Sequence, residues 1–419
     1  MDIPVSLRDD ICGDWKSHLL RSPMTNQPKP ILANALIALR EAPDWLGVLA
    51  HDEFALVPMA MRPPPWQQRL DISWTPQPWA DGDDARATEW LHHQGIVVSL
   101  TVTQTAILAV AGENPFHPIK DYLNALRWDG TPRIEAFVTR YLGADDTAYH
   151  RAIGRCMLIA AVARIMRPGS KVDHVPVLEG EQGILKSTAI EKMFAPWFSD
   201  DLAELGTKDA AMQIRVAWGI EIAELASMTR SEIEKIKGFI TRKVDRFRPP
   251  YGRHVICVPR QSVLIGSTNT EAYLKDDTGA RRFWPIKCGD INTAGIDRDK
   301  DQLWAEALAL FSRGVPWWLN GDDTFLAQVE QDDRHVVDPW QESINRYLEG
   351  KDRTSITEIL ECVIDKPKER WTQLDQSRVG ACLKGAGFVR KRGQRPARQW
   401  YYARGVPVDT GTDDEDWDR

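Results

Sequence analysis

The sequence predicts an α/β fold, and two patterns carry that prediction. After Pro168, short apolar runs alternate with segments of helical periodicity; the runs are VPVL, VAWGIEI, SVLIGSTN and RRFWPI. Strands that alternate with helices are typical of a mostly parallel sheet in an α/β layer. Before that region, from Asn114 on, apolar residues recur at spacings of three and four, which is typical of amphipathic helices.

The helical region contains three predicted helices. PIKDYLNALRW and RIEAFVTRYLG each have one apolar face, and the segment WDGTP between them predicts a turn. YHRAIGRCMLIAAVARIM predicts a longer, buried helix that ends at Arg167-Pro168-Gly169. From about Ser355, the pattern predicts a helix, a turn, a second helix with Asp375 as its N-cap, and a basic two-stranded hairpin.

The first 112 residues are rich in proline and tryptophan. The chain has 17 tryptophans, and six of them precede residue 91. We interpret these as core anchors rather than as a surface for stacking bases. Asp81, Asp83 and Asp84 form the one acidic cluster of this region, and we expect them to be a solvated lead-in to the helix ATEWLHHQG.

Length and composition exclude several classes of protein. At 419 residues the chain is too long for one compact domain. No apolar run approaches the roughly 18 residues that span a bilayer, and the N-terminus lacks the pattern of a signal peptide. The six cysteines include no CxxC pair, and neither HExxH nor GxSxG occurs. We therefore expect a cytoplasmic protein without a zinc ribbon, a disulfide framework or a metal-hydrolase site.

A phosphate-binding loop is predicted directly after VPVL. The string GEQGILKST fits the Walker A formula GxxxxGK[ST] except that Leu185 stands where the second glycine is expected. In such a loop, backbone N–H groups cradle phosphates, the lysine reaches the β- and γ-phosphates, and the hydroxyl ligates Mg²⁺. The alternative is an ordinary strand–turn–helix. The predicted nucleotide-binding residues are Gly180, Gly183, Lys186, Ser187 and Thr188, with Ser187 and Glu221 as the Mg²⁺ residues.

Catalytic candidates follow in the order that a phosphoryl-transfer enzyme requires. Glu221 and Glu224 end the run VAWGIEIAEL, where one acid would hold the Mg²⁺ water shell and a second would polarise the attacking water. Asn269 ends the next apolar run and could position that water. Arg281 and Arg282 could stabilise charge in the transition state, within one subunit or between neighbours. Taken singly, these residues also fit solvated carboxylates, a turn cap and a surface arginine pair.

Two basic segments are candidates for DNA contact despite the formal net charge of −7. Between residues 242 and 260, six bases surround one acid and are interleaved with Phe247 and Tyr251, as a single-strand channel requires. From Lys366 to Arg404, eleven bases face two acids, and the predicted helices and hairpin resemble a winged-helix DNA-binding domain. The alternatives are a basic loop that packs on a neighbouring subunit and a winged helix that contacts only protein. In the first segment, which also contains Arg242, Lys243 and Arg260, the predicted contacts are Arg246, Arg248 and Arg253. In the second segment they are Arg390, Lys391, Arg392 and Arg395.

From about Asn114 to Pro285 the sequence resembles the virulence-associated protein E family. The carrying segments are GEQGILKST, WGIEIAEL, ITRKVDRFRPPYGR, IGSTN and DDTGARRFWPI. These are P-loop proteins of phages, plasmids and genomic islands, related to superfamily 3 helicases of the AAA+ class. The resemblance implies a hexameric, ring-forming ATPase that uses ATP and Mg²⁺ in replication of a mobile element. It further implies that Lys186 and Ser187 contact phosphate and Mg²⁺, that Glu221 and Glu224 are the Walker B acids, that Asn269 is sensor 1, and that Arg281 or Arg282 is a finger that reaches the adjacent subunit.

The complete prediction is a P-loop AAA+-type α/β core with additional domains on both sides. The expected segments are an N-terminal accessory domain (1–112), a helical collar (113–170), the ATPase core (171–340), a winged helix (341–405) and an acidic, disordered tail (406–419). The expected function is that of an ATP-driven DNA helicase or replication initiator in the cytoplasm of a bacterial host. Its expected partners are single-stranded DNA in the ring pore, double-stranded DNA at the winged helix, and a separate primase, with no membrane. The alternative is a nucleotide-dependent or catalytically inert DNA-binding ring that loads or blocks replication proteins without unwinding.

Overall fold

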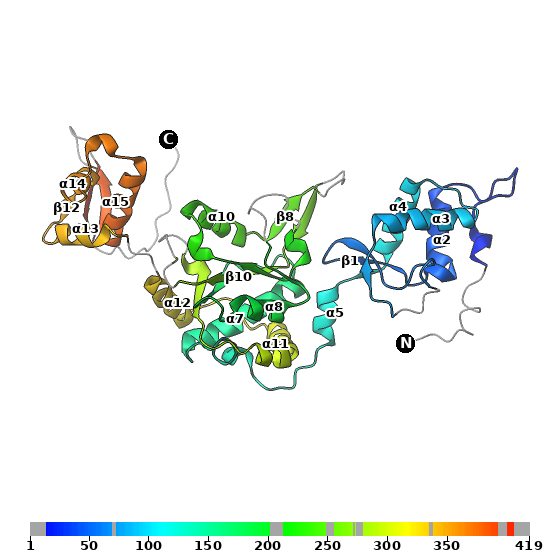
Figure 1. The fold of residues 1–419 in the computed structure, drawn as a ribbon, viewed down its shortest axis with the longest axis horizontal. Helices are drawn as coiled ribbons and strands as arrows, with labels where there is room; N and C mark the ends of the chain where they lie inside the picture. The colour runs from blue at the N-terminus through cyan, green and yellow to red at the C-terminus, as the bar shows by residue number, and fades with distance from the viewer. Residues whose placement is uncertain are drawn as a thin grey trace. The chain divides into compact units, whose positions relative to one another are not determined.

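The computed structural model describes residues 14–68, 73–201, 213–248, 255–270, 273, 280–334, 338–392 and 400–405. The chain divides into two compact units, Met1–Arg334 and His335–Arg419, and each is described by itself (Figure 1). No helix within these ranges is long and apolar enough to cross a membrane. The finer division into five segments stays a prediction.

The first unit begins with a small region built around tryptophan. Its elements are η1 (Trp15–His18), α2 (Leu32–Glu41), η2 (Pro43–Trp45), β1 (Leu49–Asp52), β2 (Val57–Ala60), β3 (Gln77–Pro78), α3 (Asp81–His93), α4 (Leu100–Glu113) and β4 (Pro115–Phe116). The strands form one sheet in the order β3-β2-β1-β4. Trp15 and Trp45 are buried, and Trp66, Trp79 and Trp90 pack against the same core. The interpretation of these tryptophans as core anchors is confirmed.

The acidic cluster of this region differs from its prediction. Helix α3 begins at Asp81, so the three acids form its first turn, where the helix dipole favours negative charge. Asp84 is buried, and its carboxylate accepts hydrogen bonds from Trp79 Nε1 at 2.8 Å and Gln104 Nε2 at 2.9 Å. The prediction of a solvated lead-in is therefore wrong for Asp84, which satisfies polar atoms of two half-buried side chains, whereas Asp81 is exposed as predicted.

A helical layer links this region to the central sheet. It consists of α5 (Pro118–Ala125), η3 (Ile134–Ala136), α6 (Phe137–Leu142) and α7 (Ala148–Met166). The segment that was predicted as one helix over RIEAFVTRYLG starts as the 3-10 turn η3 before α6. The prediction of a long buried helix is confirmed by α7, whose N-cap Thr147 accepts a hydrogen bond from His150 N–H at 3.1 Å.

The centre of the first unit is a five-stranded parallel sheet, which confirms the predicted α/β class. The sheet consists of β5 (Val175–Glu179), β6 (Phe198–Ser199), β7 (Gly219–Ile222), β10 (Val263–Thr268) and β11 (Phe283–Lys287), in the order β11-β5-β10-β7-β6. The associated helices are α8 (Lys186–Phe194), η4 (Ile214–Val216), η5 (Leu225–Ser227), α10 (Arg230–Ile240), η6 (Ala280–Arg282), α11 (Thr293–Ser312) and α12 (Asp322–Asp333). Four of the strands contain the apolar runs that the sequence analysis identified.

Alternate residues of these strands enter two separate hydrophobic cores. Val177 and Leu264 pack with α10 on one face, whereas Leu178 and Ile265 pack with α7, α8 and α11 on the other. Figure 1 shows the same arrangement, with α10 on one side of β10 and α7, α8 and α11 on the opposite side. A sheet covered on both faces requires continuously apolar strands, which is why the strands appear as apolar runs rather than alternating patterns.

An antiparallel hairpin of β8 (Val244–Phe247) and β9 (Ile256–Pro259) lies between α10 and β10 in the chain. At its base, Arg260 is 3% exposed and donates to both carboxylate oxygens of Asp245, at 2.7 and 3.0 Å, and to Phe239 O at 2.5 Å. Arg260 belongs to the segment predicted to contact DNA, but the structure assigns it to this buried ion pair. The pair closes the hairpin against α10.

The second unit has three helices and a three-stranded antiparallel sheet in the order β12-β14-β13. Its elements are α13 (Gln341–Leu348), β12 (Arg353–Thr354), α14 (Ile356–Cys362), η7 (Lys368–Arg370), α15 (Gln373–Gly385), β13 (Phe388–Arg392) and β14 (Trp400–Arg404). The predicted helices and hairpin are present. The N-cap of α15 is Thr372 rather than Asp375; Asp375 occupies the third helical position and accepts hydrogen bonds from Thr372 N–H and Oγ1, each at 2.8 Å. A Thr–Asp capping box satisfies more backbone groups than Asp375 could satisfy alone as the cap.

The ion pair at the hairpin base generates a stability prediction. Arg260→Ala should lower the free energy of unfolding of the first unit by about 3–5 kcal/mol, because it leaves the Asp245 carboxylate buried and unpaired. Urea denaturation measures the change. Arg151→Ala, which removes an exposed ion pair with Asp146, is the control and should leave the urea concentration at the unfolding midpoint unchanged. A shift for Arg260→Ala no larger than that of the control would contradict the assigned role.

Candidate functional site

The loop 180–185 connects the buried strand β5 to helix α8. Its starting point is held firmly, since Glu179 is fully buried and both its carboxylate oxygens accept a hydrogen bond from Arg334 Nε at 3.1 Å. Gly180 and Gly183 have φ angles of +147° and +89°, which glycine adopts far more readily than other residues. The loop thus reverses direction and presents the N-terminus of α8 at the carboxyl edge of the sheet.

Leu185 occupies the position at which the loop motif requires glycine. Its backbone is left-handed, with φ +71° and ψ +27°, and its side chain is 48% exposed. For a residue with a Cβ this conformation costs about 1–2 kcal/mol. Leucine therefore does not change the path of the loop but strains it, because the turn into α8 still needs a positive φ.

Lys186 is the first residue of α8 and is buried, with 7% of its surface exposed. Its Nζ donates to Gly180 O at 2.7 Å, to Glu181 O at 2.8 Å and to Asn269 Oδ1 at 3.0 Å. Burial lowers the pKa of Lys186 from its usual value, against an opposing influence of Cys288, Glu224 and Glu221. The ammonium group thus bridges the loop and the end of β10.

Ser187 and Glu221 meet at the same edge. The Ser187 hydroxyl donates to Glu221 Oε1 at 2.7 Å, and the Ser267 hydroxyl donates to the same oxygen at 2.6 Å. Glu221 lies in β7 and is 1% exposed. The sequence analysis missed Ser267, although it lies two residues before Asn269 in the segment IGSTN. The signal that could have identified it is a hydroxyl near the end of a predicted strand that neighbours the strand with the predicted acid.

Glu224 and Asn269 complete the cluster. Asn269 Nδ2 donates to Glu224 Oε1 at 3.0 Å, while Asn269 Oδ1 accepts from Lys186. Glu224 has φ +54° and ψ +42°, a second left-handed residue that is not glycine. Such strain persists only where the surroundings hold it, and it concentrates at functional sites. Five predicted residues, from the ends of two strands (β7 and β10) and from helix α8, are therefore in hydrogen-bond contact with one another or adjacent in the chain. The predicted Thr188 follows in the first turn of α8.

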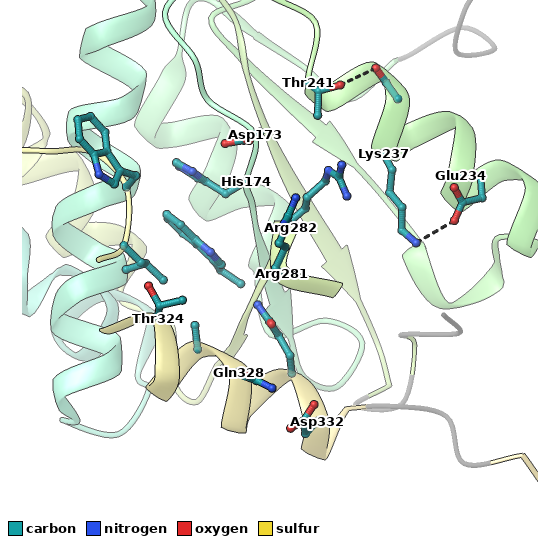
Figure 2. A pocket seen from close by; sticks show the side chains of 16 residues that line it. Asp173, His174, Glu234, Lys237, Thr241, Arg281, Arg282, Thr324, Gln328 and Asp332 are labelled. Carbon is teal, nitrogen blue, oxygen red and sulfur yellow. Dashed lines mark hydrogen bonds and ion pairs between the residues drawn. The ribbon is translucent and has the colours of Figure 1, made fainter. Parts of the chain in front are cut away.

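Arg281 and Arg282 are not part of this cluster. They form the end of η6, just before β11, and β11 runs parallel to β5 with Phe283 opposite Val175 and Lys287 opposite Glu179. The arginines thus lie at the amino edge of the sheet, about 13 Å of strand away from the edge that carries Lys186. They line a separate cavity, which Figure 2 shows together with Asp173 and His174.

The predicted DNA contacts are exposed wherever they are described. Arg246 and Arg248 flank the buried Phe247 at the end of β8. Arg390, Lys391 and Arg392 are exposed on β13, where the guanidiniums of Arg390 and Arg392 lie 4.3 and 5.5 Å from the ring centre of Trp400. Arg253 and Arg395 lie outside the described residues.

The donor set at Ser187 and Glu221 fits a magnesium ion that shares its coordination with phosphate. Mg²⁺ prefers oxygen ligands, keeps several waters and is held by one or two protein groups when phosphates supply the rest. The hydroxyl and carboxylate are adjacent and at the N-terminus of α8, where a phosphate is favoured. The described residues contain no group of three or more His, Cys, Asp or Glu that could hold a metal by themselves.

The strained loop generates a second prediction. Leu185→Gly should be more stable than Leu185→Ala by about 0.5–1 kcal/mol, because both substitutions remove the same side chain but only glycine relieves the left-handed strain. The two unfolding transitions, measured in urea under identical conditions, give the difference. Equal stabilities would show that residue 185 is not left-handed in solution.

Comparison with known proteins places this geometry in a family. Residues 123–336, just over half of the chain, match the model of the virulence-associated protein E-like domain. No curated protein matches the chain. Among solved structures, an apo structure of the NrS-1 C-terminal region is similar, with a TM-score of 0.49, 10% identity and coverage of 85% of this chain and 95% of that one. A second apo form has a TM-score of 0.46, 11% identity and coverage of 90% and 100%. The family match spans the loop, the acids and the asparagine, and the chain belongs to the virulence-associated protein E-like family.

Proposed function

We propose that this protein is an ATP-driven DNA helicase or replication initiator of a mobile genetic element, built on a P-loop AAA+-type core and acting as a ring on DNA. One observation carries the proposal. Residues separated by up to 83 positions gather at the N-terminus of α8 in two hydrogen-bonded sets, Lys186–Asn269–Glu224 and Ser187–Glu221, which meet at the consecutive Lys186 and Ser187. These are the residue types that phosphoryl transfer requires: a cation, a hydroxyl, two carboxylates and an amide.

Each group of the cluster has a distinct role in ATP hydrolysis. Lys186 exchanges its bonds with Gly180 O and Glu181 O for oxygens of the β- and γ-phosphates. Ser187 and Glu221 would hold Mg²⁺, which would supply positive charge against the charge that develops on the phosphates. Glu224 accepts a proton from the attacking water, and Asn269, hydrogen-bonded to Glu224, orients that water. The products are ADP and inorganic phosphate.

Arg281 or Arg282 is proposed to act on a neighbouring copy. Their place at the amino edge of the sheet supports this, because β11 holds them away from the cluster of their own chain. A guanidinium supplied by an adjacent subunit stabilises charge in the transition state and makes hydrolysis depend on assembly. A closed ring, for which we propose six subunits, gives every cluster such a neighbour.

Two surfaces are proposed to bind DNA. The hairpin β8–β9 carries the exposed Arg246 and Arg248 and would contact a single strand in the pore. The second unit, with two helices followed by a basic hairpin, is proposed to act as a winged helix on duplex DNA, through Arg390, Lys391 and Arg392. We further propose that the protein works in the cytoplasm of a bacterial host with a separate primase.

The strain at Leu185 favours a second candidate function. The strain raises the energy of the closed loop, and Lys186 already has three acceptors within the protein that a phosphate would have to displace. The alternative is a DNA-binding ring that loads or blocks replication proteins without unwinding. ATP turnover in the presence and absence of single-stranded DNA separates the two candidates.

The cluster predicts the behaviour of two lysine variants of the same helix. Lys186→Ala should abolish ATP hydrolysis because it removes the contact to the transferred phosphate. Lys192→Ala, which removes a partly exposed ion pair with Asp297, should retain it. A coupled assay of phosphate release measures both variants, with circular dichroism to confirm that each is folded. Equal turnover of the two variants would contradict the assignment of the loop.

The ring is tested in the same assay by mixing. Arg281→Ala and Lys186→Ala subunits are inactive alone for different reasons, so mixed rings that contain an intact cluster beside an intact finger should recover part of the activity. Arg282→Ala is tested in parallel, and the variant that complements identifies the finger. Absence of recovery with either arginine variant would count against a finger supplied by the neighbour.

The second unit predicts a change in salt dependence. Arg390→Ala combined with Arg392→Ala should weaken binding to duplex DNA and reduce the slope of log K against log salt by about 1.8, since each phosphate contact contributes about 0.9. Arg346→Ala, whose guanidinium already pairs with Glu342, is the control and should leave the slope unchanged. Fluorescence anisotropy over a series of salt concentrations provides the slopes. An unaltered slope for the double variant would exclude β13 from the duplex interface.

A further inference from the structure

A cavity of about 980 Å³ lies at the amino edge of the central sheet, within the first unit and away from the Lys186 cluster. Its walls come from α10, from η6 and the start of β11, from the segment between α11 and α12, from α12 itself, and from the residues just before β5. Figure 2 shows Asp173, His174, Arg281 and Arg282 on one side and Thr324, Gln328 and Asp332 of α12 on another. The proposed function uses only Arg281 or Arg282 of this wall, as a finger, and assigns no ligand to the cavity. Its volume is at the upper end of the range for small-molecule sites.

Two side chains that line the cavity each contain a buried polar atom without a partner in the described part of the chain. These atoms are Nε2 of His174, which is 7% exposed, and Nε of Arg282. Burial lowers the pKa of His174 to about 3, so the ring is neutral at pH 7 and Nε2 is able to donate or accept, depending on its tautomer. A buried polar atom without a partner costs about 1–3 kcal/mol, and a side-chain rotation that brings it to a ligand in the cavity would remove that penalty.

The charges of the cavity favour an anion. Lys237 Nζ lies 2.9 Å from Glu234 Oε1, and Asp173 lies 3.3 Å from Lys171 Nζ, so these charges are compensated locally. Neither Arg281 nor Arg282 has a carboxylate partner among the described residues, and Asp332 is the remaining acid on the wall. Guanidinium groups bind phosphate in a planar, two-pronged geometry that suits it better than other anions.

The aromatic side chains favour a flat ring beside that anion. His174 stacks on Trp284, with ring centres 3.6 Å apart and an interplanar angle of 10°, which gives the cavity a rigid aromatic wall. Trp318 also lines the cavity and is 51% exposed, although an indole of this size is normally covered. An exposed indole and arginines on the wall of one cavity are the groups that proteins use to stack a nucleobase while holding its phosphate.

We propose that this cavity binds a nucleoside phosphate unit, with the base stacked on Trp318 and the phosphate held by Arg282. The unit is either a free nucleotide or one nucleotide of a single strand. Arg281 is the more exposed of the two arginines and remains free to reach a neighbour. This site is separate from the proposed ATP site of the same chain, because Lys186 lies at the opposite edge of the sheet.

The test uses the full chain with Lys186→Ala, so that the proposed ATP site does not contribute to binding. The probe is thymidine 5′-monophosphate, and its binding is measured by isothermal titration calorimetry. We expect one binding event per chain, and about tenfold weaker binding when Trp318→Ala or Arg282→Gln is added, since stacking of one base contributes about 1–3 kcal/mol. Phe325→Ala, a 67% exposed aromatic of α12 outside the cavity wall, is the matched control and should bind as the parent does.

A second arm distinguishes the two sources of the ligand. A short oligothymidylate is titrated into the same proteins, and its dependence on Trp318 and Arg282 is compared with that of the mononucleotide. If the two substitutions weaken binding of both probes, or of the mononucleotide alone, the ligand is a free nucleotide. If they weaken binding of the oligonucleotide alone, the ligand is one nucleotide of a strand. The proposal is overturned if neither probe binds, or if Trp318→Ala and Arg282→Gln bind both probes as the Phe325→Ala control does. Because every protein carries Lys186→Ala, this outcome does not depend on whether the protein hydrolyses ATP.

Discussion

The parallel pairing of β5, β10 and β7 is the constraint on which the candidate site depends. Gly266 of β10 lies opposite both Val177 of β5 and Ile222 of β7, so the three strands end at one edge. The groups that follow them are then held within hydrogen-bond distance although they are far apart in the chain. Burial on both faces of the sheet fixes this register, because a shift by one residue would exchange the side chains of its two cores.

The site contains strain that the surrounding contacts hold in place. Leu185 and Glu224 both have left-handed backbones. Leu185 precedes Lys186, which donates a hydrogen bond to Asn269, and Glu224 itself accepts one from Asn269. The buried Lys186 ammonium is satisfied by two loop carbonyls and one amide oxygen, which keeps the loop closed around it. A phosphate would have to replace these bonds. The Lys186 ammonium group thus has its hydrogen bonds satisfied by the protein alone, and nucleotide binding would exchange one set of oxygen acceptors for another.

The two edges of the sheet have different chemistry. The carboxyl edge gathers hydroxyls, acids, an amide and a lysine at a helix N-terminus, whereas the amino edge gathers two arginines, stacked aromatic rings and a large cavity. Strands of five or six residues separate the edges by more than the length of a side chain. A group at one edge therefore acts on the other only through a neighbouring copy or through movement of the sheet.

By itself, the sequence determined which residues end the strands. The apolar runs, the string from Gly180 to Thr188, the acids Glu221 and Glu224, and Asn269 could all be found because each signal lies within a few consecutive residues. Only the tertiary structure decided the partners. Arg260 pairs with Asp245, Asp84 with Trp79 and Gln104, and Ser267 with Glu221 because strand pairing and helix packing bring them together. A local pattern reports periodicity and turns, but burial and partners depend on contacts between distant segments, and these decided which charges face solvent.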